Sequence, residues 1–271
     1  MFIDAHCHLT DLRFEGIRDQ VIEKARKSQV THFIQGGVDL AEWDRQVELK
    51  RALSSTVTLV FGIHPWTIAH QSDVALRQAF DRLPEYLKEA KALGEIGLDF
   101  GPRTSKDSYA LQEEYFRRQL RLAKEGKFPV VLHVVRAHDQ VMNILNQEGF
   151  PAVGGIVHAF SGSYEIAKRY IDLGLHLSLG AAATQEKYQE TLRNLSLDSI
   201  VVESDAPDML PRGVIPDFFD SERKPLNAPH AIWYVANAVA KAKNMQPEDV
   251  LKVSGKHCSE IFRLKLDGHD G

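Results

Sequence analysis

Cysteine is scarce in this sequence. The two cysteines among 271 residues, Cys7 and Cys258, lie almost a full chain length apart, and Cys7 stands between two histidines. This arrangement argues against a structural disulfide and against a small, disulfide-stabilised secreted protein. We therefore expect reduced thiols and a cytoplasmic protein.

Long apolar runs are also missing. A membrane-spanning helix needs about 18 consecutive uncharged apolar residues, and no segment of the sequence provides them. The first residues, MFIDAHCH, have neither the basic region nor the long apolar region of a secretory signal. We expect no membrane partner and no export by that route, and the sequence shows no sign of an obligate protein partner.

An excess of basic charge is the third absence. The formal net charge is −4, which argues against a protein that coats nucleic acid, because such binding depends on Lys and Arg neutralising phosphates. A locally basic active-site mouth is compatible with this balance. Hydrophobic residues make up 44% of the chain, and no Ser-, Gln- or Pro-dominated linker interrupts it. Residues 1–271 are therefore expected to fold as a single domain.

Short β-branched and aliphatic runs alternate with stretches of helical periodicity. In the stretch 107–126, the residues expected on the buried face are Leu111, Tyr115, Leu120, Leu122 and Ala123. Parallel strands need crossover helices, and a closed sheet leaves no edge, so the order predicts a (β/α)8 TIM barrel, with an open doubly wound sheet as the alternative. The eight expected strands lie near 2–5, 30–36, 56–63, 91–97, 129–134, 153–158, 175–180 and 198–203.

The longest irregular segment follows the last expected strand. Residues 207–227 contain four prolines, which restrict the backbone and predict an ordered cover over the barrel mouth. Two helices are expected after it, at 228–243 and 247–264, with prolines near their first turns.

Histidines and acids stand where the expected strands end. The C-terminal ends of barrel strands lie together, so side chains spread over about two hundred positions converge at one mouth. Imidazole and carboxylate are ligand groups for divalent cations, and the set predicts a catalytic metal site. Its members are His6, His8, Glu95, His133, His158 and Asp205.

His6 and His8 are two residues apart, so they point to the same side of an extended strand. Two imidazoles on one side can share a cation, and we expect this pair to do so. The alternative is a structural pair whose ring nitrogens are satisfied by hydrogen bonds. Cys7 points to the opposite side and is expected to be a small core residue. His64 in FGIHPW also follows a strand, and we expect it to support the site from outside or to contact a substrate phosphate.

The remaining positions of the set carry similar alternatives. Glu95 in GEIGLD lies in an apolar run, where a cation or a salt bridge would offset its burial, and its carboxylate could bridge two cations. His133 and His158 end the runs VVLH and GIVH, where a lone histidine would more often be a hydrogen-bonded core residue. Asp205 in VVESD is expected to be the inner carboxylate, with Glu203 behind it.

Several motifs together resemble the TatD family of metal-dependent deoxyribonucleases. They run in order from residue 3 to about residue 207: FIDAHCHL, GIHPW, GEIGLDF, the strand-end His133, HAFSGS and ESDAP. The resemblance implies a metal-bearing barrel of the amidohydrolase-like superfamily. It also implies a first metal held by His6, His8, Glu95 and Asp205, and a second held by Glu95, His133 and His158, with Glu95 as the bridge.

The chain departs from the family pattern after His133. The family has Ser and Arg there, whereas this sequence has Val134 and Val135, with Arg136 one place later. Arg136 is a candidate substitute for the phosphate-contacting Arg, and Arg103 is a second candidate substrate contact. Near the C-terminus, His257 stands where the family has Asn.

The leading hypothesis is hydrolysis of DNA phosphodiesters at the barrel mouth by a water activated with two divalent metal ions, Mg, Mn or Zn. Asp205 would accept or direct the proton of that water, with Glu95 between the metals, and the resemblance implies removal from the 3′ end. Phe218, Phe219 or Trp66 could stack a base. The alternatives are an amide, ester or lactone hydrolase on the same scaffold, and a metal-binding scaffold without turnover.

Overall fold

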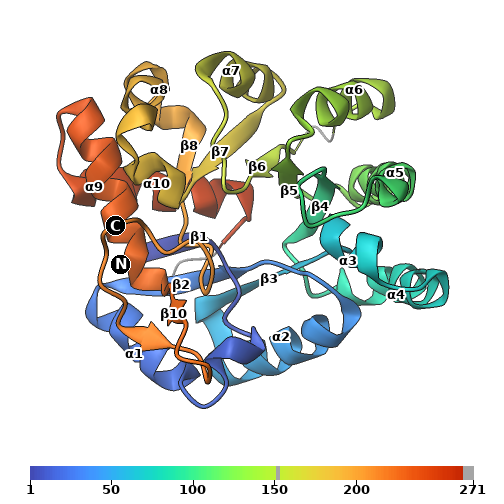
Figure 1. Ribbon diagram of the computed structural model, residues 1–271, viewed down its shortest axis with the longest axis horizontal. Helices are drawn as coiled ribbons and strands as arrows, with labels where there is room; N and C mark the ends of the chain where they lie inside the picture. Colours follow the sequence, from blue (N-terminus) through green and yellow to red (C-terminus); the bar gives the residue numbers. More distant parts are fainter. Residues whose placement is uncertain (151–152, 265–271) are drawn as a thin grey trace.

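The computed structural model describes residues 1–150 and 153–264. Its main sheet has eight parallel strands in chain order, and the helices form an outer ring around them (Figure 1). The strands are β1 (Phe2–Cys7), β2 (Val30–Gln35), β3 (Val57–Phe61), β4 (Ala92–Asp99), β5 (Val130–Val135), β6 (Gly155–Val157), β7 (Leu175–Leu179) and β8 (Ile200–Val202). All eight expected strands are confirmed, with ends shifted by up to two residues.

The helices up to α8 lie between the strands of the barrel, as crossover connections require, and α9 and α10 follow the last strand. They are α1 (Arg18–Lys27), α2 (Leu40–Leu53), α3 (Pro65–His70), α4 (Asp73–Tyr86), α5 (Tyr109–Gly126), α6 (His138–Glu148), α7 (Tyr164–Asp172), α8 (Gln189–Asn194), α9 (Ile232–Lys243) and α10 (Pro247–Ile261). Within residues 1–150 and 153–264, no helix combines the length and apolar character needed to cross a bilayer.

The first and last strands meet at their C-terminal ends. The backbone N–H of Asp205 donates to the carbonyl of His6 at 3.0 Å, and the N–H of His8 donates to the carbonyl of Ala206 at 2.7 Å. Below this seam, the Asp4 carboxyl receives hydrogen bonds from the Ser204 backbone N–H at 2.9 Å and the Ser204 hydroxyl at 2.5 Å. Hydrogen bonds between the first and last strands therefore connect the two ends of the TIM barrel at the position of the candidate site.

Two apolar layers support the barrel. One fills the space between the strands and the helices. The other lies inside the barrel, where α10 contributes the side chains that pack against the strand interior. This inner layer consists of Ile3, Ala5, Ile34, Val60, Ala92, Val131, Ile156, Val201, Cys258, Ile261 and Phe262. Side chains therefore fill the barrel interior beneath the site.

The face of α5 differs from the sequence expectation. Tyr115, Leu120 and Ala123 are buried as expected, but Leu111 and Leu122 are only partly buried. Gln112 and Gln119 are fully buried in their place. Their amides bond to backbone groups of Asp99 and Ile63, at strand ends, so polar residues occupy a core face that hydropathy assigned to leucine.

The segment 207–227 is ordered by ion pairs and a short antiparallel pair of strands, β9 (Phe218–Phe219) and β10 (Pro225–Leu226). Arg13 binds Asp208 through both terminal nitrogens at 2.6 and 2.8 Å, and Lys24 of α1 lies 3.1 Å from Asp217. These contacts hold the segment on the α1 side of the barrel (Figure 1).

Candidate metal centre

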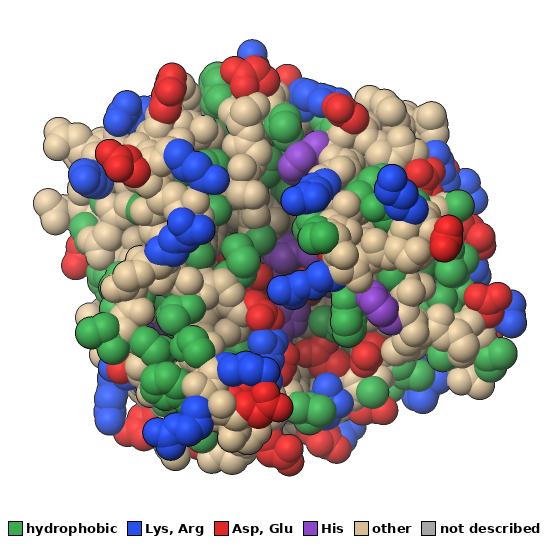
Figure 2. Space-filling view, viewed as in Figure 1, with side chains coloured by type: hydrophobic (Ala, Val, Ile, Leu, Met, Phe, Trp, Pro, Cys, Tyr) green, Lys and Arg blue, Asp and Glu red, His purple; other side chains and the backbone are tan. Residues whose placement is uncertain are grey.

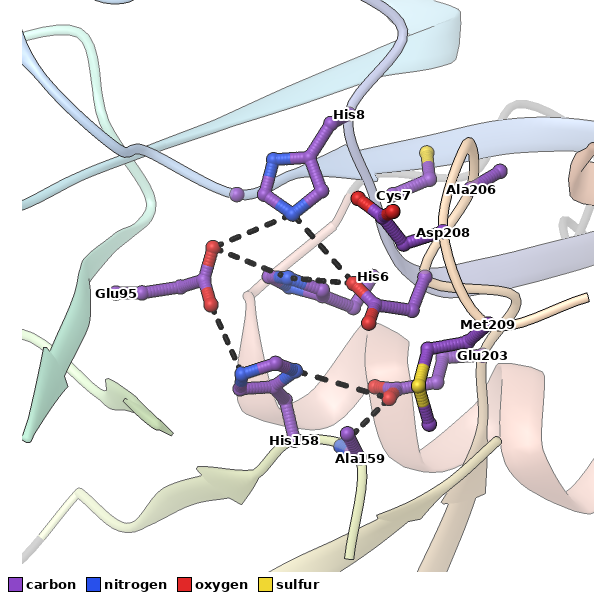
Figure 3. A network of polar contacts seen from close by, with 12 residues as sticks. His6, Cys7, His8, Glu95, His158, Ala159, Glu203, Ala206, Asp208 and Met209 are labelled. Atoms are coloured by element: carbon purple, nitrogen blue, oxygen red, sulfur yellow. Dashed lines mark hydrogen bonds and ion pairs between the residues drawn. The ribbon is translucent and has the colours of Figure 1, made fainter. Parts of the chain in front are cut away.

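The structure brings all six expected side chains together. His6 lies in β1 and His8 just after it, Glu95 in β4, His133 in β5, and His158 and Asp205 follow β6 and β8. Five of them therefore lie at or near the C-terminal end of a barrel strand, and Glu95 lies in the middle of β4. Figure 3 shows the carboxylate of Glu95 facing His6, His8 and His158.

Glu95 divides the cluster into two groups of donors. Its Oε1 lies 3.3 Å from His6 Nε2 and 3.4 Å from His8 Nε2. Its Oε2 lies 2.9 Å from His158 Nε2 and 3.7 Å from His133 Nδ1. The side chain is 1% exposed. A single buried carboxylate thus presents one oxygen to each of two pairs of imidazoles.

Asp205 completes the first group. Its Oδ1 lies 3.5 Å from His8 Nε2 and 3.8 Å from His6 Nε2. The residue has φ of 55°, in the left-handed region, and its backbone N–H is bonded to the carbonyl of His6. The seam between β8 and β1 therefore fixes the Asp205 backbone directly beside the two histidines.

Three observations show that this cluster fits divalent cations. Ligand-type atoms of His6, His8 and Asp205 lie within 4.8 Å of one another, and so do those of His6, Glu95 and His158. Buried His6 Nε2 and Glu95 Oε1 have no hydrogen-bond partner among the described residues, and an unpaired buried polar atom is costly.

Gly36 supplies the third observation. It follows β2, and a Cβ atom built there would lie 2.4 Å from His6 Cε1 and 2.7 Å from both Glu95 Oε1 and His8 Cε1. Only a residue without a side chain leaves that space between the donors free. Sequence reasoning did not identify this position, because a single glycine after a strand has many possible causes.

Carboxylates lie behind three of the imidazoles, as is usual for metal-binding histidines. His133 Nε2 lies 3.2 Å from Asp99 Oδ2, His158 Nδ1 lies 3.8 Å from Glu203 Oε1, and His8 Nδ1 lies 3.9 Å from Glu42 Oε1. Glu203, which was expected behind Asp205, lies behind His158. Asp99 and Glu42 were missed, although Asp99 is four residues after Glu95 in the same strand and so faces the same side.

The hydrogen-bond partners assign the tautomers of His133 and His64. His133 Nε2 donates to Asp99 at 3.2 Å, so in the neutral ring it is Nδ1 that carries the lone pair. His64 Nδ1 accepts from the backbone N–H of Trp66 at 2.9 Å, so its Nε2 carries the proton. That Nε2 lies 3.1 Å from His133 Nδ1 and 3.7 Å from Glu95 Oε2.

His64 also lies in a group with Glu95 and His133 whose atoms could hold a metal. A metal ligand needs a lone pair, and the only lone pair of the neutral His64 ring is used by Trp66. His158 Nε2 lies 2.9 Å from Glu95 Oε2 and 2.9 Å from His133 Nδ1, so its neighbours are other side chains of the cluster and not a backbone N–H. The geometry therefore favours His158 as a metal ligand. His64 instead presents an N–H group that can donate a hydrogen bond toward the site.

Electrostatics keep the acids of the cluster ionised. Burial would raise the pKa of Glu95, but the imidazoles of His6 and His158 hold that pKa well below its usual range. Burial likewise opposes ionisation of Asp205, and His8 and its neighbours still lower the Asp205 pKa. Burial drives the pKa of His64 well below its usual value, which keeps this ring neutral.

The pKa values of two histidines are raised. Burial would lower the pKa of His158, but the charges of Glu95 and Glu203 raise it well above the usual value. The pKa of His133 is also raised, because bonds to Asp99 and Glu95 outweigh its burial. Positive charge is thus favoured among these acids, and a divalent cation would supply it.

The other expected residues lie away from the donor cluster. Arg103 and Arg136 are exposed, on the segments after β4 and β5, and Arg136 has φ of 54°. Trp66 is 46% exposed and Phe219 is 48% exposed, so both rings remain accessible. Cys7 is fully buried, with Sγ 3.7 Å from the carbonyl of Ile34, which agrees with its expected core position.

A parallel barrel with buried histidines and acids at its C-terminal mouth has the architecture of a metal-dependent hydrolase. The family model described as TatD related DNase matches residues 3–263, and the chain belongs to this family. The resemblance noted in the sequence is therefore confirmed.

Three relatives illustrate the family. The uncharacterized metal-dependent hydrolase YabD of Bacillus subtilis is 29% identical over 97% of this chain and 100% of its own length. The 3'-5' ssDNA/RNA exonuclease TatD of Pantoea ananatis is 30% identical over 86% and 90%. The crystal structure of YjjV, a TatD homologue from Escherichia coli, has a TM-score of 0.83 at 28% identity, covering 97% of this chain and 98% of that one.

Proposed function

We propose that this protein hydrolyses phosphodiester bonds of DNA and removes nucleotides from the 3′ end of a single strand. The observation that carries the proposal is the position of Glu95, whose two oxygens face separate donor groups. Such an arrangement suits a pair of divalent cations, Mg, Mn or Zn. The name of the Pantoea relative as a 3'-5' ssDNA/RNA exonuclease supports the choice of substrate and polarity.

The residues of the cluster would bind the two cations in two groups. His6, His8 and Asp205 would hold one cation and His133 and His158 the other, with Glu95 shared. When bound, the cations would polarise the phosphoryl group and lower the pKa of an attacking water.

Asp205 is the acid best placed to act on that water. Its carboxylate is ionised, partly accessible at 13% exposure, and lies at the edge of the first donor group. It would direct the water by accepting a hydrogen bond and would then take its proton. This role complements that of Glu95, which is buried between the two groups.

His64 offers a hydrogen bond to the substrate. Its ring is neutral, and the proton on Nε2 faces the cluster. A phosphate oxygen near Glu95 could accept that proton in a hydrogen bond. Figure 2 shows histidine and acidic side chains in a hollow near the centre of this face, with Lys and Arg side chains around it. Arg103 and Arg136 are proposed as further phosphate contacts.

The test is degradation of a 5′-labelled single-stranded oligonucleotide by protein supplied with Mg or Mn. The expected result is a ladder that shortens from the 3′ end and disappears with a chelator or with Asp205→Asn. An intact oligonucleotide in the presence of bound metal would contradict the proposal. Small ester and lactone substrates would then be tried, since the same scaffold can hydrolyse acyl groups.

A further inference from the structure

A second hollow lies in the outer helix layer, among segments that follow β7 and β8. It has a volume of about 560 Å³ and lies between α8 and α9, which contact each other (Figure 1). This volume is in the range of about 300–1,000 Å³ that is common for pockets holding small organic groups. We refer to it as the α8–α9 groove.

The segments that follow β7 and β8 form one end of the α8–α9 groove. Pro211 and Arg212 line it and follow Asp205 on the segment after β8. Thr184 also lines it, at the end of the 3-10 helix η4 (Ala181–Thr184). Gly180 directly precedes that helix, and a Cβ added there would lie 3.4 Å from Glu203 Oε1. The groove is thus bounded by the chain segments that leave the metal centre after β7 and β8.

The lining combines positive charge with an accessible ring. Arg212 and Lys241 are exposed, and Tyr234 is 43% exposed. Many exposed cations of this protein, such as Lys24 and Lys224, have a carboxylate within 4 Å. Among the described residues, no carboxylate lies within that distance of Arg212 or Lys241. Glu186 is the acid in the lining.

Unpaired cations beside an exposed aromatic ring are the features by which proteins bind single-stranded nucleic acid. Cations follow the phosphates, and the ring stacks on a base without selecting its identity. The lining also includes Pro211, Val214 and Ala238, whose apolar groups can contact the faces of bases, and the amides of Asn237 and Gln189, which can bind phosphate oxygens or base edges. The charge and the exposed ring of this lining therefore favour a single-stranded nucleic acid as the ligand.

We propose that the α8–α9 groove binds the part of a single DNA strand that extends out of the metal centre. Arg212 and Lys241 each contact a phosphate, and Tyr234 stacks on a base. The inference rests on the proposed nuclease function, because that function places the end of the strand at Glu95. It adds a binding surface that the hydrolytic groups do not include.

Binding can be measured separately from cleavage. Fluorescence anisotropy would follow metal-loaded protein binding to a single strand of about 12 nucleotides, within the roughly 4–16 nucleotides that single-strand-binding folds cover. Phosphorothioate linkages would slow hydrolysis. The variants are Tyr234→Ala and the double substitution Arg212→Gln with Lys241→Gln. The matched control is Lys252→Gln with Lys256→Gln, two cations on α10 that are 68% and 73% exposed.

The salt dependence of binding distinguishes a phosphate contact from a structural effect. Each lost contact to a single strand should reduce the slope of log affinity against log salt by about 0.7, so the double variant should lose about 1.4. Tyr234→Ala should weaken binding about tenfold. The control pair should match the wild type. All variants should hydrolyse bis(p-nitrophenyl) phosphate, which is too small to reach the groove, at the wild-type rate.

The outcomes separate the two proposals. If wild-type protein binds the strand and both groove variants keep its affinity and salt slope, the groove proposal is wrong. It is also wrong if the wild type does not bind the strand at low salt. If the groove variants lose affinity and slope while the wild type fails to cleave ordinary DNA, the contacts of the groove with a single strand hold, and the proposed nuclease function falls together with the placement of the strand end at Glu95.

Discussion

The space beside Gly36 gives the sharpest test of where a metal would lie. Gly36→Ala would add one methyl group at 2.4 Å from His6 Cε1 and 2.7 Å from Glu95 Oε1 and His8 Cε1. All three distances are shorter than van der Waals contact, and Glu95 is fully enclosed. The backbone of Gly36 does not have positive φ, so alanine itself is acceptable there and the effect comes from the methyl group.

Two consequences of different size follow from this overlap. Overpacking a buried site costs about 1–3 kcal/mol of folding stability, which leaves most of a typical domain stability intact. The ligands of the first donor group, however, must move apart by several tenths of an ångström or more. Since disturbing even the supports of metal ligands costs about 10–100-fold in affinity, we expect at least about 100-fold weaker binding in the first donor group.

The assay is titration of chelator-treated protein with Mn or Zn, followed by calorimetry and by metal content after dialysis. Gly255→Ala in α10 is the matched control, because its Cβ would lie 3.8 Å from Ile3 Cγ1 of β1, an ordinary van der Waals contact. That helical substitution should add about 0.5–1 kcal/mol of stability and leave metal binding unchanged. Wild-type stoichiometry and affinity in Gly36→Ala would refute the placement of a cation between these donors.

Three further predictions concern the supports of the site and the fold. Glu203→Gln removes the charge behind His158 and should weaken metal binding about 10–100-fold in a titration; unchanged affinity would exclude that supporting role. Burial and nearby Lys50 lower the pKa of His32 to about 4, so the unfolded chain binds the proton first and wild-type stability should fall by up to about 3 kcal/mol from pH 6.5 to 4. The free energy of unfolding of His32→Gln in urea should lack this loss. If it falls with pH as steeply as that of the wild type, the prediction is wrong. Gln119→Leu leaves the buried N–H and carbonyl of Ile63 unpaired and should cost about 2–4 kcal/mol in urea unfolding, whereas a loss below about 1 kcal/mol would show that water replaces the amide.

The barrel was predictable because each strand is a short apolar run followed by a turn. Strands buried on both faces need such runs, and their alternation with helical stretches leaves few other topologies. The burial pattern of α5 was less predictable. Gln112 and Gln119 lie seven residues apart on one helical face, and their amides satisfy backbone groups at the ends of β4 and β3. Hydropathy alone assigns such residues to solvent.

The inner donors were predictable from their positions at strand ends, but their supports were not. Asp99 and Glu42 act through contacts that depend on the approach of separate elements, and an acid near a strand or on a helix is ordinarily solvated. The state of His64 depends on a backbone N–H two residues away. Ligand type and position could therefore be predicted, whereas tautomer and charge required the three-dimensional arrangement.

The location of the cluster over the barrel seam links its formation to folding. His6 and Asp205 come from the first and last strands, and their backbones are joined directly to each other. The buried pair of Asp4 and Ser204 fastens the same two strands below, and burial raises the pKa of Asp4 to about 8 despite its hydrogen bonds. Donors from both ends of the barrel assemble only when it closes. A cation bound at about 100 times its dissociation constant would add about 2.7 kcal/mol to that closed state, so the proposed cofactor would also stabilise the fold.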